Sequence, residues 1–196
     1  MKKPTYLIIA FIVVMFLYLA YPAYLIATHE NILTTGEVYR FKPRPVDPYD
    51  AFRGKYIVLS YEQNSLSYPN AAETFDSNSK AYLKVEKDTQ GFAKITDAYT
   101  HAPDFSNYIE VNINYTDPNV IYFNLPITRY YMNEDYALAA EKAYNDMLRQ
   151  QNRNGSNSTT VAAYVDVRVK DGMAIIEELY LQGEPIMEFL RKKEEL

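Results

Sequence analysis

The 196-residue chain has no cysteine and no tryptophan, only two histidines and only six glycines. Without cysteine it cannot form disulfides, bind a metal through thiolates or use a cysteine nucleophile. A Ser-His-Asp triad needs a histidine, and neither His29 nor His101 has a recognisable nucleophile motif nearby. Walker A, Rossmann, G-x-S-x-G and HExxH patterns are missing as well. We therefore expect no cofactor, no catalytic metal and no catalytic residue of these classes.

Positive charge is also scarce, with 20 Lys and Arg against 25 Asp and Glu and a formal net charge of −5. Lys2 and Lys3 are the only charged residues before His29, so the remainder carries 18 basic and 25 acidic residues, a balance of −7. A nucleic-acid-binding surface needs clustered Lys and Arg to hold phosphates. The charge pattern therefore argues against a nucleic-acid partner.

One long uncharged segment dominates the N-terminal region. Residues 6–26 read YLIIAFIVVMFLYLAYPAYLI, which is 21 residues with Pro22 as the one interruption of the apolar run. A helix of that length measures roughly 31 Å and matches a hydrocarbon core of about 30 Å. Four tyrosines in this segment suit the interfaces of a membrane. We therefore predict a single transmembrane helix that contacts the lipid bilayer through residues 6–26.

The flanking charges predict the orientation of this helix. Lys2 and Lys3 lie on its short N-terminal side, and the positive-inside rule then keeps the N-terminus in the cytoplasm. A cleaved signal peptide is the alternative, but the apolar run exceeds the usual 7–15 residues and no clean A-x-A site follows it. We therefore predict that residues 1–28 form the cytoplasmic N-terminus and anchor of a cell-membrane protein. Residues 29–196 are predicted to form one extracytoplasmic domain.

The remainder of the chain alternates short strand-like segments with turns. Strands are predicted at 37–43, 55–62, 82–87, 92–99, 107–115, 161–169 and 173–181, and in the segment 120–131, where Pro126 ends or edges the strand. Asp171-Gly172 indicates a hairpin turn. An amphipathic helix is predicted from Asn133 to about Gln150. The fold class is therefore α+β, with an N-terminal transmembrane helix and a β-dominated domain that has one main packed helix.

Two further expectations concern single segments. The segment 55–62 is apolar on both faces, which is typical of a central strand covered on both sides. The C-terminal tail, residues 187–196, is charged and helix-prone, so we expect it to be peripheral.

A short motif resembles a known family. Residues 54–61 read Gly-Lys-Tyr-Ile-Val-Leu-Ser-Tyr, which resembles the octapeptide Gly-Asp-Tyr-x-x-Leu-x-Tyr of the GDYXXLXY family. Gly54, Tyr56, Leu59 and Tyr61 agree with that pattern, and Lys55 replaces its aspartate. The preceding residues 45–53 also look like the family's approach to the motif. The resemblance implies a membrane-anchored bacterial protein of unassigned biochemical function, with one N-terminal span and a mostly β exterior part.

The motif predicts a candidate binding site next to it. Loops on a rigid scaffold often carry function, so the candidate ligand or partner contacts are Asp47, Asp50, Arg53 and Glu62. We interpret the exterior domain as a non-enzymatic binding or accessory module that acts through another membrane or envelope protein. The same turn residues also have a purely structural reading, in which they only shape the turn.

The sequence also contains residues that two other chemistries would use. A membrane-anchored hydrolase of the signal-peptidase type would need a Ser–Lys dyad, for which Ser60 with Lys55 or Lys94 supplies the parts, but the expected nucleophile motif after the span is missing. Calcium could use Asp47, Asp50 and Glu62, or Asp171 with Glu177 and Glu178. Neither set has the spacing of a calcium-binding loop, and scattered surface acids explain both sets better.

Overall fold

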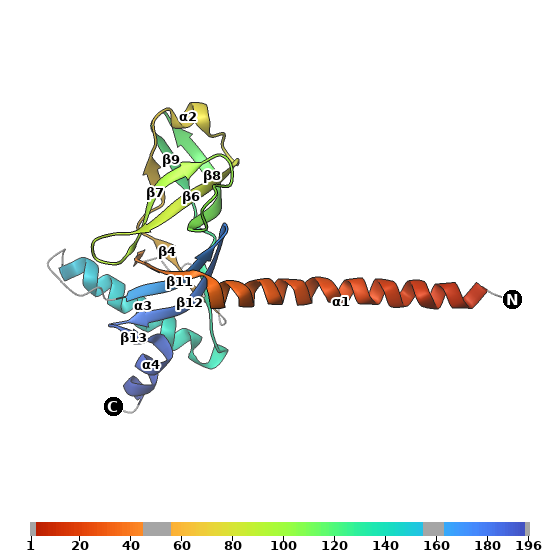
Figure 1. The fold of residues 1–196 in the computed structure, drawn as a ribbon. Coiled ribbons are helices and arrows are strands. Elements are labelled where there is room, and N and C mark those ends of the chain that lie inside the picture. Colours follow the sequence, from red (N-terminus) through yellow and green to blue (C-terminus); the bar gives the residue numbers. More distant parts are fainter. Residues whose placement is uncertain (1–2, 45–55, 155–162, 195–196) are drawn as a thin grey trace.

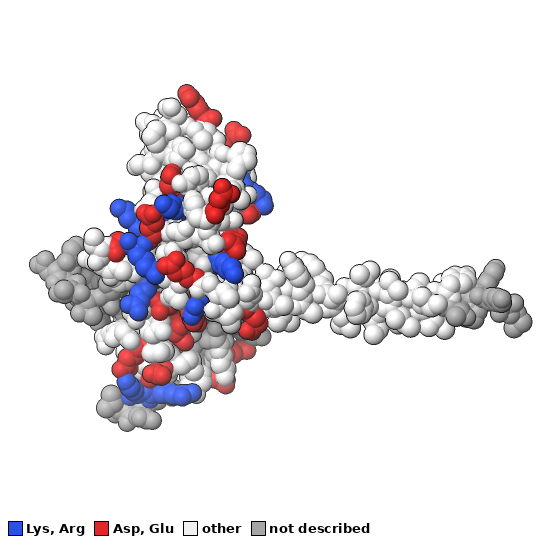
Figure 2. Space-filling view, viewed as in Figure 1, with Lys and Arg blue, Asp and Glu red and all other residues white. Residues whose placement is uncertain are grey.

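The computed structural model describes residues 3–44, 56–154 and 163–194. Its first element is the helix α1, Lys3–Thr35, which projects from the rest of the molecule with the N-terminus at its far tip (Figure 1). Pro22 lies inside the helix without ending it. In the described chain α1 is the one helix long and apolar enough to cross a membrane, and no residue of its most apolar 18-residue window is buried. Figure 2 shows that the projecting part is almost bare of charged side chains.

The C-terminal end of α1 belongs to the folded domain. Ile32 is only 2% exposed, and α1 lies against the strands β11, Ala163–Lys170, and β12, Met173–Leu181. Gly36 ends the helix by donating its N–H to the carbonyl of Ile32 at 2.8 Å. A Cβ at Gly36 would lie 2.6 Å from that oxygen, so the tight exit requires glycine. The helix crosses residue 28, the predicted boundary, without interruption and leads directly into β1, Glu37–Phe41.

The strand pairings divide the described domain into two lobes. The α/β lobe contains the antiparallel sheet β1-β11-β12-β13, in which β13 is Glu184–Pro185, together with the helices α3, Glu134–Asn154, and α4, Ile186–Glu194. The predicted turn between β11 and β12 is confirmed. Asp171 and Gly172 have φ values of 48° and 88°, the left-handed conformations that a two-residue hairpin turn requires.

The β lobe is a five-stranded antiparallel sheet in the order β5-β9-β8-β6-β7, with the short helix α2 at its far end (Figure 1). Its elements are β5, Ser65–Ser67; α2, Ala71–Thr74; β6, Lys80–Lys87; β7, Ala93–Tyr99; β8, Tyr108–Asp117; and β9, Val120–Phe123. The predicted strands at 82–87, 92–99 and 107–115 are thereby confirmed. The strand β5 was not predicted, because the three residues SLS show no periodicity.

Two short ribbons link the lobes. One pairs β2, Pro43–Arg44, with β4, Ser60–Tyr61, and the other pairs β3, Tyr56–Val58, with β10, Arg129–Tyr131. The predicted strand at 55–62 is thus two short strands, and it does not belong to either large sheet. Pro126 separates β9 from β10, as expected for a residue that cannot donate to a ladder.

One hydrophobic core continues through both lobes. The predicted amphipathic helix is confirmed, because Ala140, Tyr144 and Leu148 lie on one face of α3 and are buried in this core. The prediction that the C-terminal tail is peripheral is wrong. Within that tail Leu190 is buried and Met187 and Phe189 pack partly buried against the core, and Ile186, just before the tail, is buried on the same side of the helix as Leu190. The observed α+β fold confirms the predicted class.

Candidate functional site

The described part of the motif runs through the junction between the lobes. Tyr56, Leu59, Tyr61 and Glu62 lie in or beside β3 and β4. The other candidate residues lie outside the described residues: Asp47, Asp50, Arg53, Gly54 and Lys55. The described part of the junction therefore consists of residues 56–64 and of the second connector between the lobes, residues 124–128.

The side chains of the motif alternate between two faces, but the expected central strand covered on both sides is wrong, because β3 and β4 each pair with one short strand only. Ile57 and Leu59 are 0% and 1% exposed and Tyr61 is 6% exposed, while Tyr56, Val58 and Ser60 are half-buried. The backbone N–H of Leu59 donates to the carbonyl of Thr128 at 2.9 Å, which ties the motif to the second connector. Successive side chains of an extended chain point to opposite faces, so one half of the motif packs in the core and the other faces outward.

Tyr61 packs on the inner face of the junction and holds it by a hydrogen bond and a ring contact. Its hydroxyl donates to the carbonyl of Ile127 at 2.7 Å, and its ring packs edge-to-face against Phe41 with the centroids 5.5 Å apart. Burial raises the pKa of the Tyr61 hydroxyl well above its usual range, so this group stays a neutral donor. Tyr61 therefore has a structural role, satisfying a backbone carbonyl inside the core.

Tyr56 has the opposite environment. Its ring lies 5.6 Å from the ring of Tyr131, and the guanidinium carbon of Arg129 lies 5.0 Å from the centroid of Tyr56. Tyr131 is 65% exposed. Tyrosine and arginine are the residues enriched in interaction hot spots, because they combine large contact area with hydrogen-bonding groups. We call Tyr56, Arg129 and Tyr131 the aromatic cluster.

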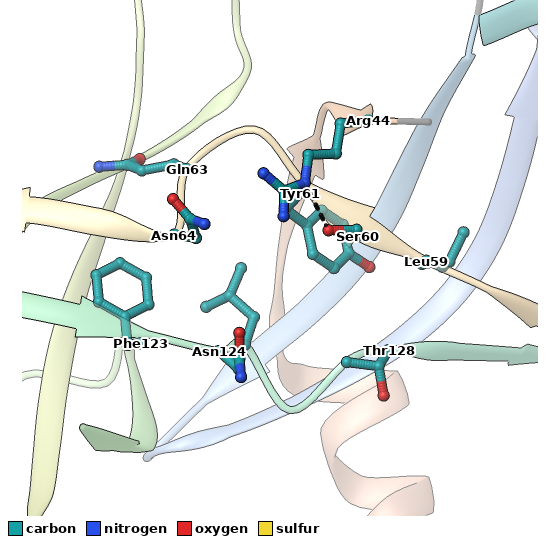
Figure 3. Close-up of a pocket in the computed structure, with 10 residues that line it drawn as sticks. Arg44, Leu59, Ser60, Tyr61, Gln63, Asn64, Phe123, Asn124 and Thr128 are labelled. Carbon is teal, nitrogen blue, oxygen red and sulfur yellow. Dashed lines mark hydrogen bonds between the residues drawn. The ribbon is translucent and has the colours of Figure 1, made fainter. Parts of the chain in front are cut away.

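A small pocket opens between the two connectors (Figure 3). Its polar lining includes Ser60, Asn64, Asn124 and Thr128, and Arg44 donates from Nε to the hydroxyl of Ser60 at 2.8 Å. The pocket has a volume of about 50 Å³. One water occupies about 30 Å³ of liquid, and ligand pockets start at about 300 Å³, so this pocket holds a water or two rather than a substrate.

A second pocket of about 150 Å³ shares Tyr61 and Gln63 with the first. Glu62 and Lys94 line it. Gln63 closes one wall, because its side-chain amide donates to the carbonyl of Ile95 and accepts from the N–H of Ile95, both at 2.8 Å. No local pattern indicates this pairing, because the two residues are 32 positions apart in the sequence. Gln63 thus covers part of the exposed edge of β7.

Ser60 and Lys94, one of the two Ser–Lys pairs proposed for a hydrolase, line different pockets. Ser60 lines the first pocket and accepts the hydrogen bond of Arg44, whereas Lys94 lines the second pocket. An arginine keeps its proton in proteins and cannot serve as a general base. The Ser60–Lys94 version of the hydrolase hypothesis is therefore not supported by the geometry, and Lys55 lies outside the described residues.

Two of the acidic residues named for calcium, Glu177 and Glu178, have protein partners. Glu177 accepts two hydrogen bonds from Arg168, at 2.7 and 2.9 Å, and Glu178 accepts one from the hydroxyl of Tyr130 at 2.6 Å. Among residues 3–44, 56–154 and 163–194, no group of three or more His, Cys, Asp or Glu side chains is arranged to hold a metal ion. These carboxylates therefore stabilise the surface of the α/β lobe.

The architecture indicates the general class of this protein. A β-rich domain that continues without a linker into a projecting apolar helix fits a membrane-anchored protein. The sequence matches the GDYXXLXY protein family over residues 18–179, which includes the last turns of the apolar segment and most of both lobes. The chain therefore belongs to the GDYXXLXY protein family. No curated protein and no solved structure matches it.

Proposed function

We propose that this protein is a single-pass membrane protein with its N-terminus in the cytoplasm, and that its extracytoplasmic domain is a non-enzymatic binding or accessory module for a membrane or envelope partner. The observation that carries the proposal is the continuity of α1, whose exposed apolar part leads into a buried end at Ile32. Such a helix anchors the domain and also fixes its orientation at the membrane surface. Residues 1–28 and 29–196 keep their proposed roles as anchor and exterior domain.

Retention of the anchor follows from the same observation. A leader peptide is normally joined to its mature domain by an extended cleavage site, whereas here residues 27–35 are helical and the helix packs on β11 and β12. The intact mass of the membrane-extracted protein should therefore include the apolar segment. A mass that lacks residues 1–26 would contradict the anchored function.

Orientation has a separate test. Lys2 and Lys3 support an N-terminus in the cytoplasm. A reporter that is active only outside the cytoplasm, fused after Leu196, should be active. An active cytoplasmic reporter at the same position would reverse the proposed topology.

The proposed partner surface is the aromatic cluster, with Asp47, Asp50, Arg53 and Glu62 as additional candidate contacts from the segments on either side of Tyr56. It differs from the two junction pockets in being exposed and in offering both aromatic faces and a cation. A protein partner that buries Tyr131 would gain contact area at small cost in side-chain entropy.

A photocrosslinking amino acid at position 131, in the full-length protein in cells, tests this surface. We expect a discrete crosslinked product that weakens when Arg129→Ala is added. The matched control is the same amino acid at Tyr115, which is 51% exposed on the β lobe. Equal crosslinking at both positions would contradict a specific surface. Loss of function on single replacement of Ser60, Lys55 or Lys94 by alanine, with the crosslink intact, would instead favour the hydrolase.

A further inference from the structure

A third pocket lies where α1 enters the domain. It has a volume of about 320 Å³, at the lower end of the range for small-molecule sites. One wall is His29 of α1, a second is Glu110 of β8 with Pro126, and the third is the β11–β12 hairpin at residues 171–175. Of the described motif candidates Tyr56, Leu59, Tyr61 and Glu62, none lines it.

The walls of this pocket are fixed by backbone contacts. The N–H of Glu110 donates to the carbonyl of Gly172 at 2.8 Å, and the N–H of Asp171 donates to the carbonyl of Ser106 at 2.9 Å. A Cβ at Gly172 would lie 3.0 Å from the ring of Tyr108, so glycine permits this close approach. The hairpin tip is therefore docked on the β lobe while α1 packs on the hairpin strands, and the pocket is preformed.

Its depth relative to a bilayer follows from α1, and this step rests on the membrane anchoring proposed above. His29 is three residues beyond Ile26, the last residue of the uncharged apolar run, which is about 4.5 Å along the helix axis. The headgroup layer on each side of the hydrocarbon core is roughly 5–7 Å thick. The pocket thus opens at the level of the lipid headgroups, on the side of the domain from which α1 emerges (Figure 1).

The lining chemistry selects among headgroups. Glu110 and Asp171 supply carboxylates. Of these two, only Glu110 has an ion-pair partner among the described residues, Lys80 at 2.5 Å. His29 has its Nδ1 2.8 Å from the carbonyl of Leu25, which leaves Nε2 for a ligand. Met173, Ala174 and Ile175 add apolar surface. A primary ammonium has three N–H donors for such acceptors, whereas a quaternary ammonium has none and is bound by aromatic rings, which this lining lacks.

We propose that this pocket binds the phosphoethanolamine headgroup of a membrane phospholipid, with the ammonium between Glu110 and Asp171 and the phosphate toward Nε2 of His29. The apolar hairpin residues 173–175 then lie beside the glycerol and the start of the acyl chains. A lipid bound there joins the anchor, the hairpin and the β lobe, and so holds the domain at one height on the membrane.

The test uses the full-length protein in nanodiscs of equal anionic-lipid content, whose remaining lipid is either phosphatidylethanolamine or phosphatidylcholine. In a further disc that contains both lipids, the protein is released with detergent, and native mass spectrometry measures which of the two lipids it retains. We expect about a five-fold enrichment of phosphatidylethanolamine, which corresponds to roughly 1 kcal/mol. We also expect a higher unfolding temperature in the ethanolamine discs.

Asp171→Asn and Glu110→Gln should each abolish the enrichment. Asparagine tolerates the left-handed conformation that position 171 adopts, so the first variant preserves the turn. Glu73→Gln, on the exposed helix α2, is the matched control and should leave the enrichment unchanged. Equal retention of the two lipids by the wild type, or enrichment that survives both pocket variants, would overturn the proposal.

Two other results have defined meanings. Loss of a crosslinked protein partner in the pocket variants, with the lipid preference unchanged, would assign the pocket to a cationic protein segment and overturn the lipid proposal. A wild-type protein that inserts into both kinds of disc but prefers neither lipid refutes only this inference. A protein that is released from cell membranes in soluble form refutes the anchored function itself.

Discussion

The two ends of α1 have similar secondary structure and opposite surroundings. Along residues 6–26 the large apolar side chains are exposed, whereas Ile32 near the C-terminal end is 2% exposed and belongs to the domain. Apolar side chains are favourable only where water is excluded, so the first end requires lipid and the second is satisfied by protein. In the anchored arrangement that we propose, the helix links the bilayer to the domain. Because the same helix runs from one to the other, it fixes the orientation of the domain relative to the bilayer.

The largest expected effect comes from breaking the lipid-facing end. Val14 and Leu17 lie in the middle of the exposed apolar segment. Each arginine at the centre of a spanning helix costs about 2.5–3.5 kcal/mol of insertion, so Val14→Arg with Leu17→Arg should remove most of the driving force. We expect the double variant to leave the membrane pellet after an alkaline wash. The Val14→Ala, Leu17→Ala protein should remain in the pellet, and equal behaviour of the two would refute the assignment of the span.

The domain-facing end should respond in the opposite way. Ile32→Ala removes a buried side chain and should lower the free energy of unfolding by about 2 kcal/mol, near the low end for such core truncations because α1 covers only one side of the sheet. The membrane fraction should not change. Denaturant unfolding in detergent measures the effect, with exposed Thr34→Ala as the control. Unchanged stability of Ile32→Ala would mean that α1 is not part of the domain core.

Tyr56 and Tyr61 of the motif also differ in their surroundings, because Tyr61 is buried and Tyr56 lies on the outer face. Tyr61→Phe deletes the hydroxyl that donates to the buried carbonyl of Ile127, so it should cost about 1–2 kcal/mol of stability. Tyr56→Phe should stay within about 0.5 kcal/mol, as expected for a surface change. Chemical denaturation of both variants measures this difference. Equal losses would show that the inner and outer faces of the motif are not distinct.

The smallest expected effect concerns pH. Asp166 is 8% exposed, its Oδ1 lies 3.3 Å from Nε of Arg40 without a hydrogen bond, and burial raises the pKa of its carboxyl despite that arginine. Because the folded state then binds the proton more tightly than the unfolded state, the charged carboxylate costs stability above the folded pKa. That cost is relieved as the pH falls through the folded pKa toward the unfolded value.

Asp166→Asn isolates this contribution, because it removes the carboxyl and leaves its charged neighbours Arg40, Arg168 and Glu177 in place. The wild type should gain stability relative to the variant as the pH is lowered from 7 to about 4, the ordinary pKa of an aspartate. Thermal melts at several pH values measure the difference. A wild type that loses stability relative to the variant over this range would contradict the raised pKa.

Local sequence patterns predicted most of the elements. Alternation located β6, β7 and β8, the Asp-Gly pair located the hairpin between β11 and β12, and helical periodicity located α3. The misses have a common physical cause. Ile186 and Leu190 are buried only because α4 folds back onto the α/β lobe, and the split of the segment 55–62 depends on its pairing with residues 43–44 and 129–131. Such partners are distant in sequence and leave no local periodicity.

The candidate sites depend even more on tertiary contacts. The motif named Tyr56 and Tyr61 but could not predict that the ring of Tyr56 would pack against Tyr131 while the hydroxyl of Tyr61 would donate to the carbonyl of Ile127. The pocket beside His29 combines three segments separated by tens of residues, and no spacing in the chain indicates it. A sequence pattern specifies which face a side chain takes, whereas a pocket requires that several faces meet.

By itself the sequence determined that residues 6–26 favour a helix in lipid, because an uncharged apolar run must satisfy its backbone hydrogen bonds internally once water is excluded. It also determined the α+β class and the resemblance to the family. Only the tertiary structure decided that α1 continues to Thr35 and packs Ile32 into the domain. That outcome depends on the shape of a sheet assembled from strands at both ends of the domain, β1 with β11 and β12, and on a glycine at position 36 that lets the chain turn into it.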